Sequence, residues 1–149
     1  YIASIVSVLK LVMNKLELLL DQHLVGSLLS KKLDLALSVH GINLTEFILM
    51  YHLGLVPEVG LNRISLAHKV ALTASGVTRV LQPMEKTGLI VKTVHPRDAR
   101  QSFVVLSASG QELLSNAITT VEHTVDSIFA LFNQEEIKTL QLLLNKLKV

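Results

Sequence analysis

The feature that most constrains the fold of this chain is a single change in its hydrophobic period. Along most of the 149 residues, apolar side chains recur at steps of three and four, the spacing of helices that are buried on one side. Residues 89–106 depart from that spacing, because "LIVKTVH" and "SFVVL" are rich in β-branched residues and flank the turn-forming "PRDARQ". The sequence therefore predicts a mainly helical protein with one β-hairpin.

Residues that start and stop helices divide the remainder of the chain. A first helix of about 35 residues is expected, with a bend near Gly26 and an end before Gly41. Ser65, Thr73 and Ser107 are expected to act as N-caps, because their hydroxyls can accept from backbone amides. Further helices are expected at residues 45–55, 65–71 and 73–88, after Ser107, and after the capping box that runs from Asn133 to Glu136.

The composition favours helices packed on helices. Half of the residues are hydrophobic, only 4% are aromatic, and the surplus consists of Leu, Val and Ile. Charged residues interrupt the apolar runs before any reaches the roughly 18 residues that span a bilayer, so no membrane partner is expected. The N-terminus has no signal-peptide pattern and the chain has no cysteine, which favours a cytoplasmic protein and excludes thiol redox sensing.

Positive charge is concentrated in the middle of the chain. Residues 60–102 contain seven basic and two acidic residues, a net charge of +5, whereas the remainder carries a net charge of −3. All four arginines belong to this segment. Such a concentration is typical of proteins that contact nucleic acid, and a solvated basic face without a function is the alternative.

The order of the expected elements matches a winged helix-turn-helix. Two helices joined by the tight "ALTAS" turn and followed by a β-hairpin make this motif. The terminal helices are too apolar to remain in water, so we expect them to pair with a second copy of the chain. Residues 1–40 and 108–149 would then form a helical dimerisation region, and residues 41–107 a DNA-binding lobe.

The helix expected at residues 73–88 has two different faces. Val77, Leu81 and Met84 fall on one side when successive residues are spaced by 100°. The opposite side is polar and consists of Ser75, Thr78, Arg79, Gln82 and Lys86. Arginine can form two hydrogen bonds with guanine, and glutamine two with adenine, so this side suits a DNA major groove. Pro83 lies inside the helix and should kink it or leave the Arg79 carbonyl unbonded.

The tip of the hairpin repeats this basic character. The stretch "HPRDAR" places His95, Arg97 and Arg100 around the turn, with Asp98 between them. We expect the Asp98 carboxylate to hold Arg100 through charge-assisted hydrogen bonds, and a fixed arginine suits the narrow, negative minor groove. The alternative is an exposed ion pair with little effect on stability.

Three of these stretches together resemble the MarR (multiple antibiotic resistance regulator) family of bacterial transcription factors. They are "TASGVTRVLQPMEKTGLI", the wing "PRDAR" and the strand-to-helix junction "LSASG". The resemblance runs from "RISLAHKV" to "SASGQELL", about a third of the chain, and the helices before and after it have compatible lengths. A recognition helix that ends in "PMEKTGL", with its proline, is similar to those of a subset of the family.

The resemblance implies a homodimer with intertwined N- and C-terminal helices and two winged lobes that bind a pseudopalindromic double-stranded DNA operator. It assigns Ser75, Thr78 and Arg79 to the recognition helix and Asp98 and Arg100 to the wing. Arg97 would contact a phosphate or a groove. Many such proteins are repressors that a small aromatic or phenolic anion releases from DNA, after binding between the dimer helices and the lobe.

Sites of other kinds find less support in the sequence. The six histidines lack metal-ligand spacing, so neither a metal nor a cofactor is expected. No nucleophile elbow or phosphate loop is present, which argues against an enzyme. The candidates for an effector pocket bring polar tips to an apolar helical region, and they are His23, Met50, Tyr51 and His52. Core packing is the alternative for Met50, and a winged helix that binds only proteins is the alternative function.

Overall fold

A computed structural model describes the backbone of residues 2–95 and 98–148, and the side chains of residues 13–93 and 102–148. The chain is mainly helical with one small sheet, and it contains the expected winged helix-turn-helix. Its elements are α1 (Ile2–Leu37), the 3-10 turn η1 (Ser38–His40), α2 (Leu44–Gly54), β1 (Leu61–Asn62), α3 (Arg63–Val70), α4 (Ala74–Lys86), β2 (Ile90–His95), β3 (Asp98–Leu106), α5 (Ala108–Phe129) and α6 (Gln134–Leu147).

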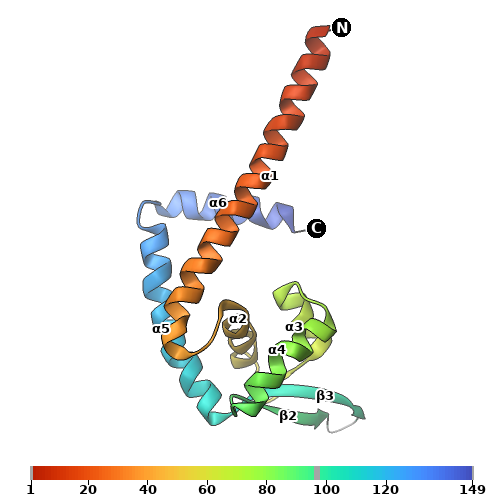
Figure 1. Cartoon of the computed structure of the whole chain (residues 1–149), viewed down its shortest axis with the longest axis vertical. Coiled ribbons are helices and arrows are strands. Elements are labelled where there is room, and N and C mark those ends of the chain that lie inside the picture. Colours follow the sequence, from red (N-terminus) through yellow and green to blue (C-terminus); the bar gives the residue numbers. More distant parts are fainter. Residues whose placement is uncertain (1, 96–97, 149) are drawn as a thin grey trace.

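The long helix α1 reaches away from a lobe built of α2, α3, α4 and the sheet (Figure 1). Its C-terminal half packs beside α5, where Lys32 Nζ donates to Ser127 Oγ at 3.0 Å. In η1, which follows α1, His40 Nε2 lies 2.8 Å from Thr120 Oγ1 of α5. Helix α1 continues through Gly26, where the sequence predicted a bend (Figure 1). A left-handed Gly41, with φ of 70°, follows η1 and ends this segment as expected.

The sheet has three antiparallel strands in the order β1-β3-β2. Ile90 pairs with Leu106 and Thr93 with Phe103, whereas Leu61 of β1 pairs with Val104. The sequence prediction was wrong about the length of the turn, since β3 begins at Asp98 and takes in most of "PRDARQ". It also missed β1, because a strand of two residues shows no alternation of polar and apolar side chains.

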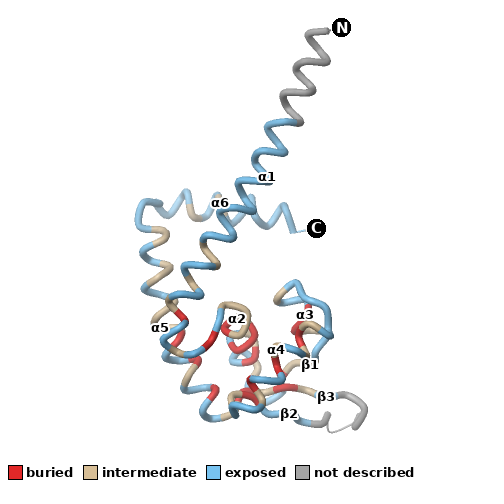
Figure 2. The backbone as a smooth tube through the Cα atoms, in the orientation of Figure 1, coloured by how far each residue is buried: buried red, intermediate tan, exposed pale blue. Residues whose placement is uncertain are grey.

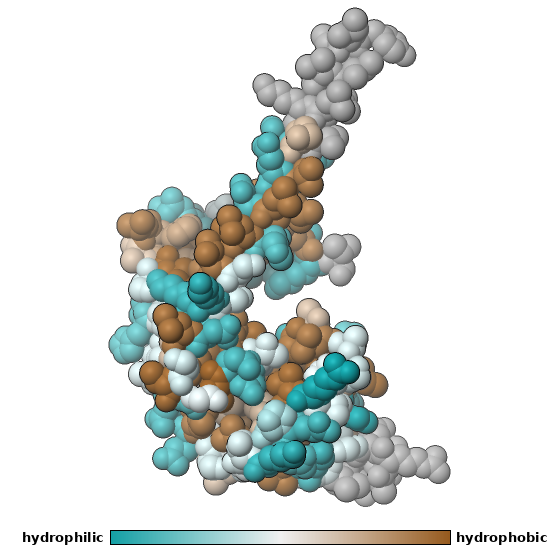
Figure 3. All heavy atoms as spheres, viewed as in Figure 1, coloured by the Kyte–Doolittle hydropathy of each residue, from teal (hydrophilic) through white to brown (hydrophobic). Residues whose placement is uncertain are grey.

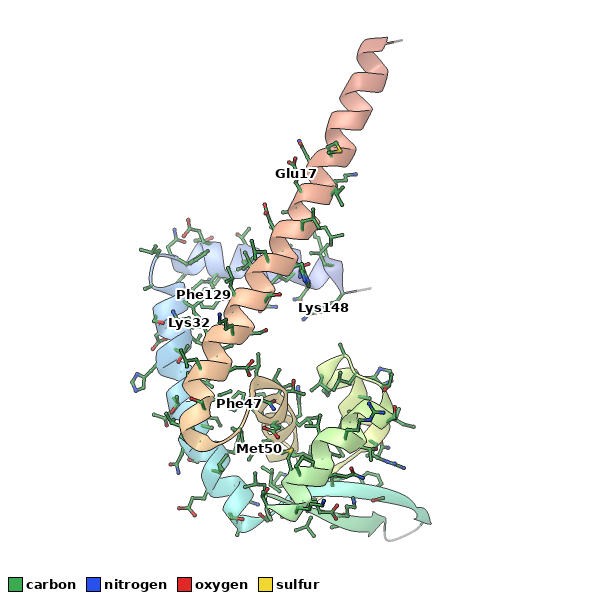
Figure 4. The ribbon with its side chains drawn as sticks, in the orientation of Figure 1. Glu17, Lys32, Phe47, Met50, Phe129 and Lys148 are labelled. Atoms are coloured by element: carbon green, nitrogen blue, oxygen red, sulfur yellow. The ribbon has the colours of Figure 1, made fainter. Side chains whose placement is uncertain are left out.

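The hydrophobic core lies inside the lobe, around α2 (Figure 2). Phe47, Leu49, Met50 and Leu53 are buried there, and α2 contacts α1, α3, α4 and α5 (Figure 4). The core also includes Leu37 from the end of α1 and Leu114 and Ala117 from the first half of α5. The core of the lobe therefore includes residues that precede and follow the segment 41–107 in the sequence.

Local hydrogen bonds explain where the helices begin. The hydroxyls of Thr73 and Ser107 accept from the amides of Gly76 and Gly110, which confirms these two N-caps. The capping box of Asn133 is also confirmed. The predicted cap of α3 was wrong, because Asn62 accepts from the Ser65 amide at 2.9 Å and the helix starts at Arg63.

Large apolar side chains remain exposed on the two terminal helices, and those of α1 form a brown band along it in Figure 3. On α1 they include Met13, Leu16, Leu18, Leu19, Leu20, Leu24, Val25 and Leu28, and on α6 they include Leu142, Leu143, Leu144 and Leu147. Within the described residues, no single helix is long and apolar enough to cross a bilayer. Residues Met13–His40 and Leu44–Gly54 meet those criteria only together, as a pair bent by 73°.

Candidate nucleic-acid interface

The turn between α3 and α4 is short and held by backbone geometry. α3 ends at Val70, its C-cap Ala71 has a left-handed φ of 51°, and the amide of Leu72 donates to the Ala67 carbonyl at 3.0 Å. Thr73 then caps α4 by accepting from the Gly76 amide at 3.1 Å. Two closely connected helices followed by a hairpin make the helix-turn-helix and wing that the sequence predicted.

The two faces of α4 confirm the predicted orientation of this helix. Val77, Leu81 and Met84 are buried in the core of the lobe. Of the polar residues on the other side, Thr78 is half-buried, and the exposed ones are Ser75, Arg79, Gln82 and Lys86. The side chains that were predicted to read bases therefore face outward, where a DNA duplex could reach them.

An open groove lies beside this polar face and involves α3 as well as α4. It is lined by Arg63 and Ile64 of α3 and by Ala74, Ser75, Thr78, Arg79 and Gln82 of α4. The sequence reasoning missed the two α3 residues, because the helical projection was confined to α4. The basic character of residues 60–102 was the only sequence signal that pointed to Arg63.

Thr78 has internal partners that limit what its hydroxyl can do. Its Oγ1 donates to the Ala74 carbonyl at 2.9 Å and accepts from Arg63 Nη1 at 3.4 Å. The hydroxyl proton is therefore used within the protein, and the long contact with Arg63 joins α3 to α4 across the groove. Base contact by Thr78 stays a prediction, with its methyl group and one remaining lone pair as the available chemistry.

Helix α4 continues through Pro83 to Lys86. Pro83 has no amide hydrogen, so it cannot donate to the Arg79 carbonyl one turn earlier. After Pro83, the amide of Thr87 donates to the Pro83 carbonyl at 2.9 Å. The helix then ends in a Schellman motif at the left-handed Gly88, where the amides of Leu89 and Gly88 donate to the carbonyls of Met84, at 2.9 Å, and Glu85, at 3.0 Å. A kink at Pro83 stays a prediction.

The end of α4 is tied directly to the start of α5. The carbonyl of Gly88 accepts from the hydroxyls of Ser107, at 2.6 Å, and Ser109, at 2.9 Å, while the Ser107 amide donates to the Leu89 carbonyl at 3.0 Å. Gly110 is required here, because a Cβ atom at this position would lie 2.0 Å from the Leu89 carbonyl oxygen. The junction "LSASG" thus fixes α4 and the wing relative to α5.

The wing leaves the lobe beside α4, and Lys92 of β2 forms an ion pair with Glu85 of α4. Both side chains are partly exposed, so the pair contributes little to stability, but Glu85 offsets the Lys92 charge beside the polar face of α4. The side chains of His95, Arg97, Asp98 and Arg100 lie outside the described residues. Their expected contacts with DNA, and the pairing of Asp98 with Arg100, stay predictions.

The four candidates for an effector pocket occupy different surroundings. His23 lies in an open hollow on α1 that is lined by Gln22, His23, Gly26, Ser27, Ser30, Lys31 and Asp34. Met50 is fully buried in the core, which supports its packing role. Tyr51 and His52 lie on α2 with their ring centroids 5.7 Å apart, and neither is among the residues that line the hollow around His23.

Burial, and secondly the positive charge of Lys69 on α3, lowers the pKa of His52 below its usual value. The shift favours the neutral imidazole, which can both donate and accept a hydrogen bond. Among the side chains that the structure describes, no group of three or more His, Asp or Glu residues is arranged to hold a metal ion.

Sequence comparisons find transcriptional regulators. The chain is 27% identical over 102 residues to the HTH-type transcriptional regulator MhqR of Bacillus subtilis, covering 66% of this chain and 67% of that protein. It is 30% identical over 81 residues to the homoprotocatechuate degradative operon repressor of Escherichia coli. That second match covers 54% of this chain and spans only 55% of the repressor. No protein-family profile matches the sequence.

Solved structures with the same architecture extend over most of the chain. A MarR-like transcription regulator from Bacillus cereus is 26% identical, with a TM-score of 0.78 over 91% of this chain and 96% of that one. The MepR–DNA complex of S. aureus is 20% identical, with a TM-score of 0.77 and coverage of 84% and 91%. CouR from Rhodococcus jostii, bound to p-coumaroyl-CoA, is 20% identical, with a TM-score of 0.78 and coverage of 89% and 90%.

These likenesses agree with the capped α4, the wing and the terminal helices that flank them. At 20% identity, the MepR and CouR structures support the fold alone. The Bacillus cereus protein, at 26% identity, is a MarR-like regulator, and the two sequence relatives are transcriptional regulators. In both sequence and fold, the chain is similar to winged helix-turn-helix transcription regulators of the MarR type.

Proposed function

We propose that the protein is a sequence-specific DNA-binding transcriptional regulator, and that α4 enters the major groove of its operator. The observation that carries this proposal is the division of α4, with Val77, Leu81 and Met84 buried and Arg79 and Gln82 exposed on the other side. Arginine and glutamine side chains on one exposed helix face provide the donors and acceptors that distinguish guanine and adenine.

Charge supports the same partner. The segment 60–102, which contains α3, α4 and the wing, carries a net charge of +5, whereas the remainder of the chain carries −3. Phosphates attract such a lobe regardless of sequence, and the base-facing side chains then select the site. The MepR structure contains DNA, and the relatives MhqR and the homoprotocatechuate repressor are transcriptional regulators rather than enzymes.

The protein acts as a homodimer in this proposal. The exposed leucines of α1 and α6 supply an apolar surface that a second copy would cover, with residues 1–40 and 108–149 as the dimerisation region and 41–107 as the lobe. Two-fold symmetry would place two α4 helices in successive major grooves. The operator is then pseudopalindromic, with half-site centres about 10 base pairs apart.

The regulator is a repressor that responds to a small aromatic or phenolic effector. Support comes from CouR, which is bound to p-coumaroyl-CoA, and from the repressor of a homoprotocatechuate degradative operon. In this chain, the polar groups that could bind such a ligand lie in two separate places, with His23 on α1 and Tyr51 and His52 on α2. The buried Met50 supports α2 from the core.

Selection of bound duplexes from a random pool, followed by anisotropy titrations at several salt concentrations, tests the DNA-binding proposal. We expect a two-fold symmetric site and an affinity that falls steeply with salt, as contacted phosphates release counterions. Arg79→Ala should reduce discrimination between bases by about 1–3 kcal/mol. Lys86→Ala, a matched loss of one positive charge from the same helix, should weaken binding to all sequences alike.

Two results would contradict the proposal. Equal effects of Arg79→Ala and Lys86→Ala on selected and random duplexes would show that α4 does not read bases. An affinity that is weak and insensitive to salt would favour a winged helix that binds protein instead.

A further inference from the structure

Among the residues that line the groove beside α4, Ile64 is the one large aliphatic side chain. Its side chain is 65% exposed, and it lines this groove together with Ser75, Arg79 and Gln82. Single exposed aliphatic residues are common on protein surfaces, so exposure alone carries no meaning. What distinguishes Ile64 is its position among the polar side chains that face outward for base contact.

The position of Ile64 is well defined by its neighbours. Asn62 caps α3 by accepting from the Ser65 amide at 2.9 Å, which fixes the first turn of the helix. Arg63, the preceding residue, reaches Thr78 of α4 at 3.4 Å. A β-branched side chain on a fixed helical turn has few rotamers, so the methyl groups of Ile64 are held at one edge of the groove.

The chemistry of the groove indicates what Ile64 would contact. The side chains of Ser75, Arg79 and Gln82 can exchange hydrogen bonds with base edges, whereas Ile64 can only offer an apolar surface. Thymine is the one base that presents a methyl group in the major groove. An aliphatic side chain beside hydrogen-bonding side chains therefore matches a thymine next to the bases that α4 contacts.

We propose that Ile64 of α3 contacts the C5-methyl group of a thymine in each operator half-site, so that base selection is shared between α3 and α4. The inference rests on the proposed DNA-binding function and adds one specific contact to it. Arg63, beside Ile64 and joined to Thr78, holds the N-terminal turn of α3 against α4 in this arrangement.

Replacement of single thymines by deoxyuridine tests the contact, because this change removes the methyl group and leaves the hydrogen-bonding edge intact. The full chain is titrated by anisotropy against its selected duplex and against duplexes with deoxyuridine at one symmetric pair of positions at a time. The same series is repeated with Ile64→Ala, with Ile64→Val, and with Val59→Ala as a control that removes an equally exposed aliphatic side chain outside the groove.

We expect one symmetric pair of positions at which deoxyuridine weakens wild-type binding by about fourfold per half-site, the value of one buried methyl or methylene group. Ile64→Ala should bind the thymine and deoxyuridine duplexes equally at that pair. Ile64→Val should retain part of the difference, and Val59→Ala should retain all of it. This loss of coupling isolates the contact from any general loss of affinity.

The proposal is overturned if Ile64→Ala responds to deoxyuridine as the wild type does at every position, or if no position in the wild-type series responds. In both cases tight, salt-dependent binding of the selected duplex would leave the DNA-binding function intact. A wild type that selects no duplex at all would overturn the function itself, together with the contact.

Discussion

Helices α4 and α1 distribute their apolar residues in opposite ways. On α4, the apolar residues Val77, Leu81 and Met84 are buried in the lobe, and the exposed side is polar. On α1, Leu20 and Leu24 belong to a series of large apolar side chains that remain more than half exposed. Helix α4 has its packing partners within the chain, whereas α1 lacks them along most of its described length.

The difference follows from where each helix lies. α4 contacts α2, α3 and β2, so its apolar side is covered on folding. Most of α1 extends beyond the lobe (Figure 1). Its C-terminal part contacts α2 and α5. Burying an exposed leucine is worth about 1.5–3 kcal/mol, so the terminal helices have a strong drive to associate and the lobe does not.

Helix α5 belongs to both regions. Its first half supplies Leu114 and Ala117 to the core of the lobe, and its second half packs beside α1 and leads to α6. The hydroxyl of Ser107, at its start, donates to the Gly88 carbonyl at the end of α4. Helix α5 therefore connects the lobe, at its N-terminal end, with the terminal helices, at its C-terminal end.

The largest expected effect tests the packing of the lobe. Met50→Ala removes a fully buried side chain from α2 and should lower the free energy of unfolding by about 2–5 kcal/mol. Leu131→Ala, in the turn between α5 and α6, removes a side chain that is 96% exposed and should change it by at most about 0.5 kcal/mol. Denaturant unfolding at one fixed protein concentration measures both.

Similar losses from the two variants would break the comparison, because the apolar residues of the terminal region would then be as well packed as those of the lobe. A small loss from Met50→Ala, with weaker effector binding, would instead return Met50 to the set of pocket candidates.

The sequence predicted features that depend on neighbours along the chain. Thr73, Ser107 and Asn133 act through amides three residues away, so their caps were found without knowledge of the fold. The two sides of α4 also follow from helical spacing alone, because Val77, Leu81 and Met84 lie on one face wherever the helix packs. The winged helix-turn-helix followed from the order of such elements.

Contacts between distant segments were not predictable in this way. Arg63 meets Thr78 only because α3 and α4 pack together, and β1 exists only because Leu61 pairs with Val104. Ser65 and Asn62 both have capping side chains, and the geometry of the preceding strand decides that Asn62 is the cap. The helical projection of one element could not place Ile64 beside the polar side of another.

The second prediction concerns the terminal helices. Leu24→Glu places a charge among the exposed leucines of α1, and in a symmetric dimer two such charges would be buried without partners. We expect dimer affinity to fall by about a hundredfold, equivalent to roughly 3 kcal/mol, as measured by sedimentation. Gln22→Glu, about 200° around the helix from Leu24, adds the same charge and should weaken association less. A monomeric wild type would contradict the explanation that a second copy of the chain covers the exposed leucines.

The third prediction compares two glycines, one from each region. Gly110→Ala forces a Cβ atom against the Leu89 carbonyl at the junction of the lobe with α5, and should destabilise the protein by about 1–3 kcal/mol. Gly26→Ala meets no atom within 4 Å on α1 and should stabilise that helix by about 0.5–1 kcal/mol. Thermal unfolding of both variants gives the signs. Opposite changes in stability would support the contrast between a crowded lobe and an open terminal helix, and changes in the same direction would contradict it.

The smallest expected effect concerns the charge on the DNA-facing side of the lobe. Glu85→Gln removes the partner of Lys92 and costs at most about 1 kcal/mol in stability, because both side chains are partly exposed. A carboxylate beside the polar face of α4 repels phosphate and neutralises Lys92, so its removal should raise DNA affinity by a few fold at low salt. With Lys92 free to contact a phosphate, the slope of log affinity against log salt should steepen by about one per protomer, or about two for the dimer.

Glu58→Gln is the matched control, since it removes the same charge from an exposed position between α2 and β1. An equal gain in affinity from Glu58→Gln would assign the effect to net charge alone. A gain limited to Glu85→Gln, measured by anisotropy on the selected duplex, would place Lys92 close enough to DNA for its partner to matter. Glu85 would then lower DNA affinity through its contact with Lys92 and not through the net charge of the lobe.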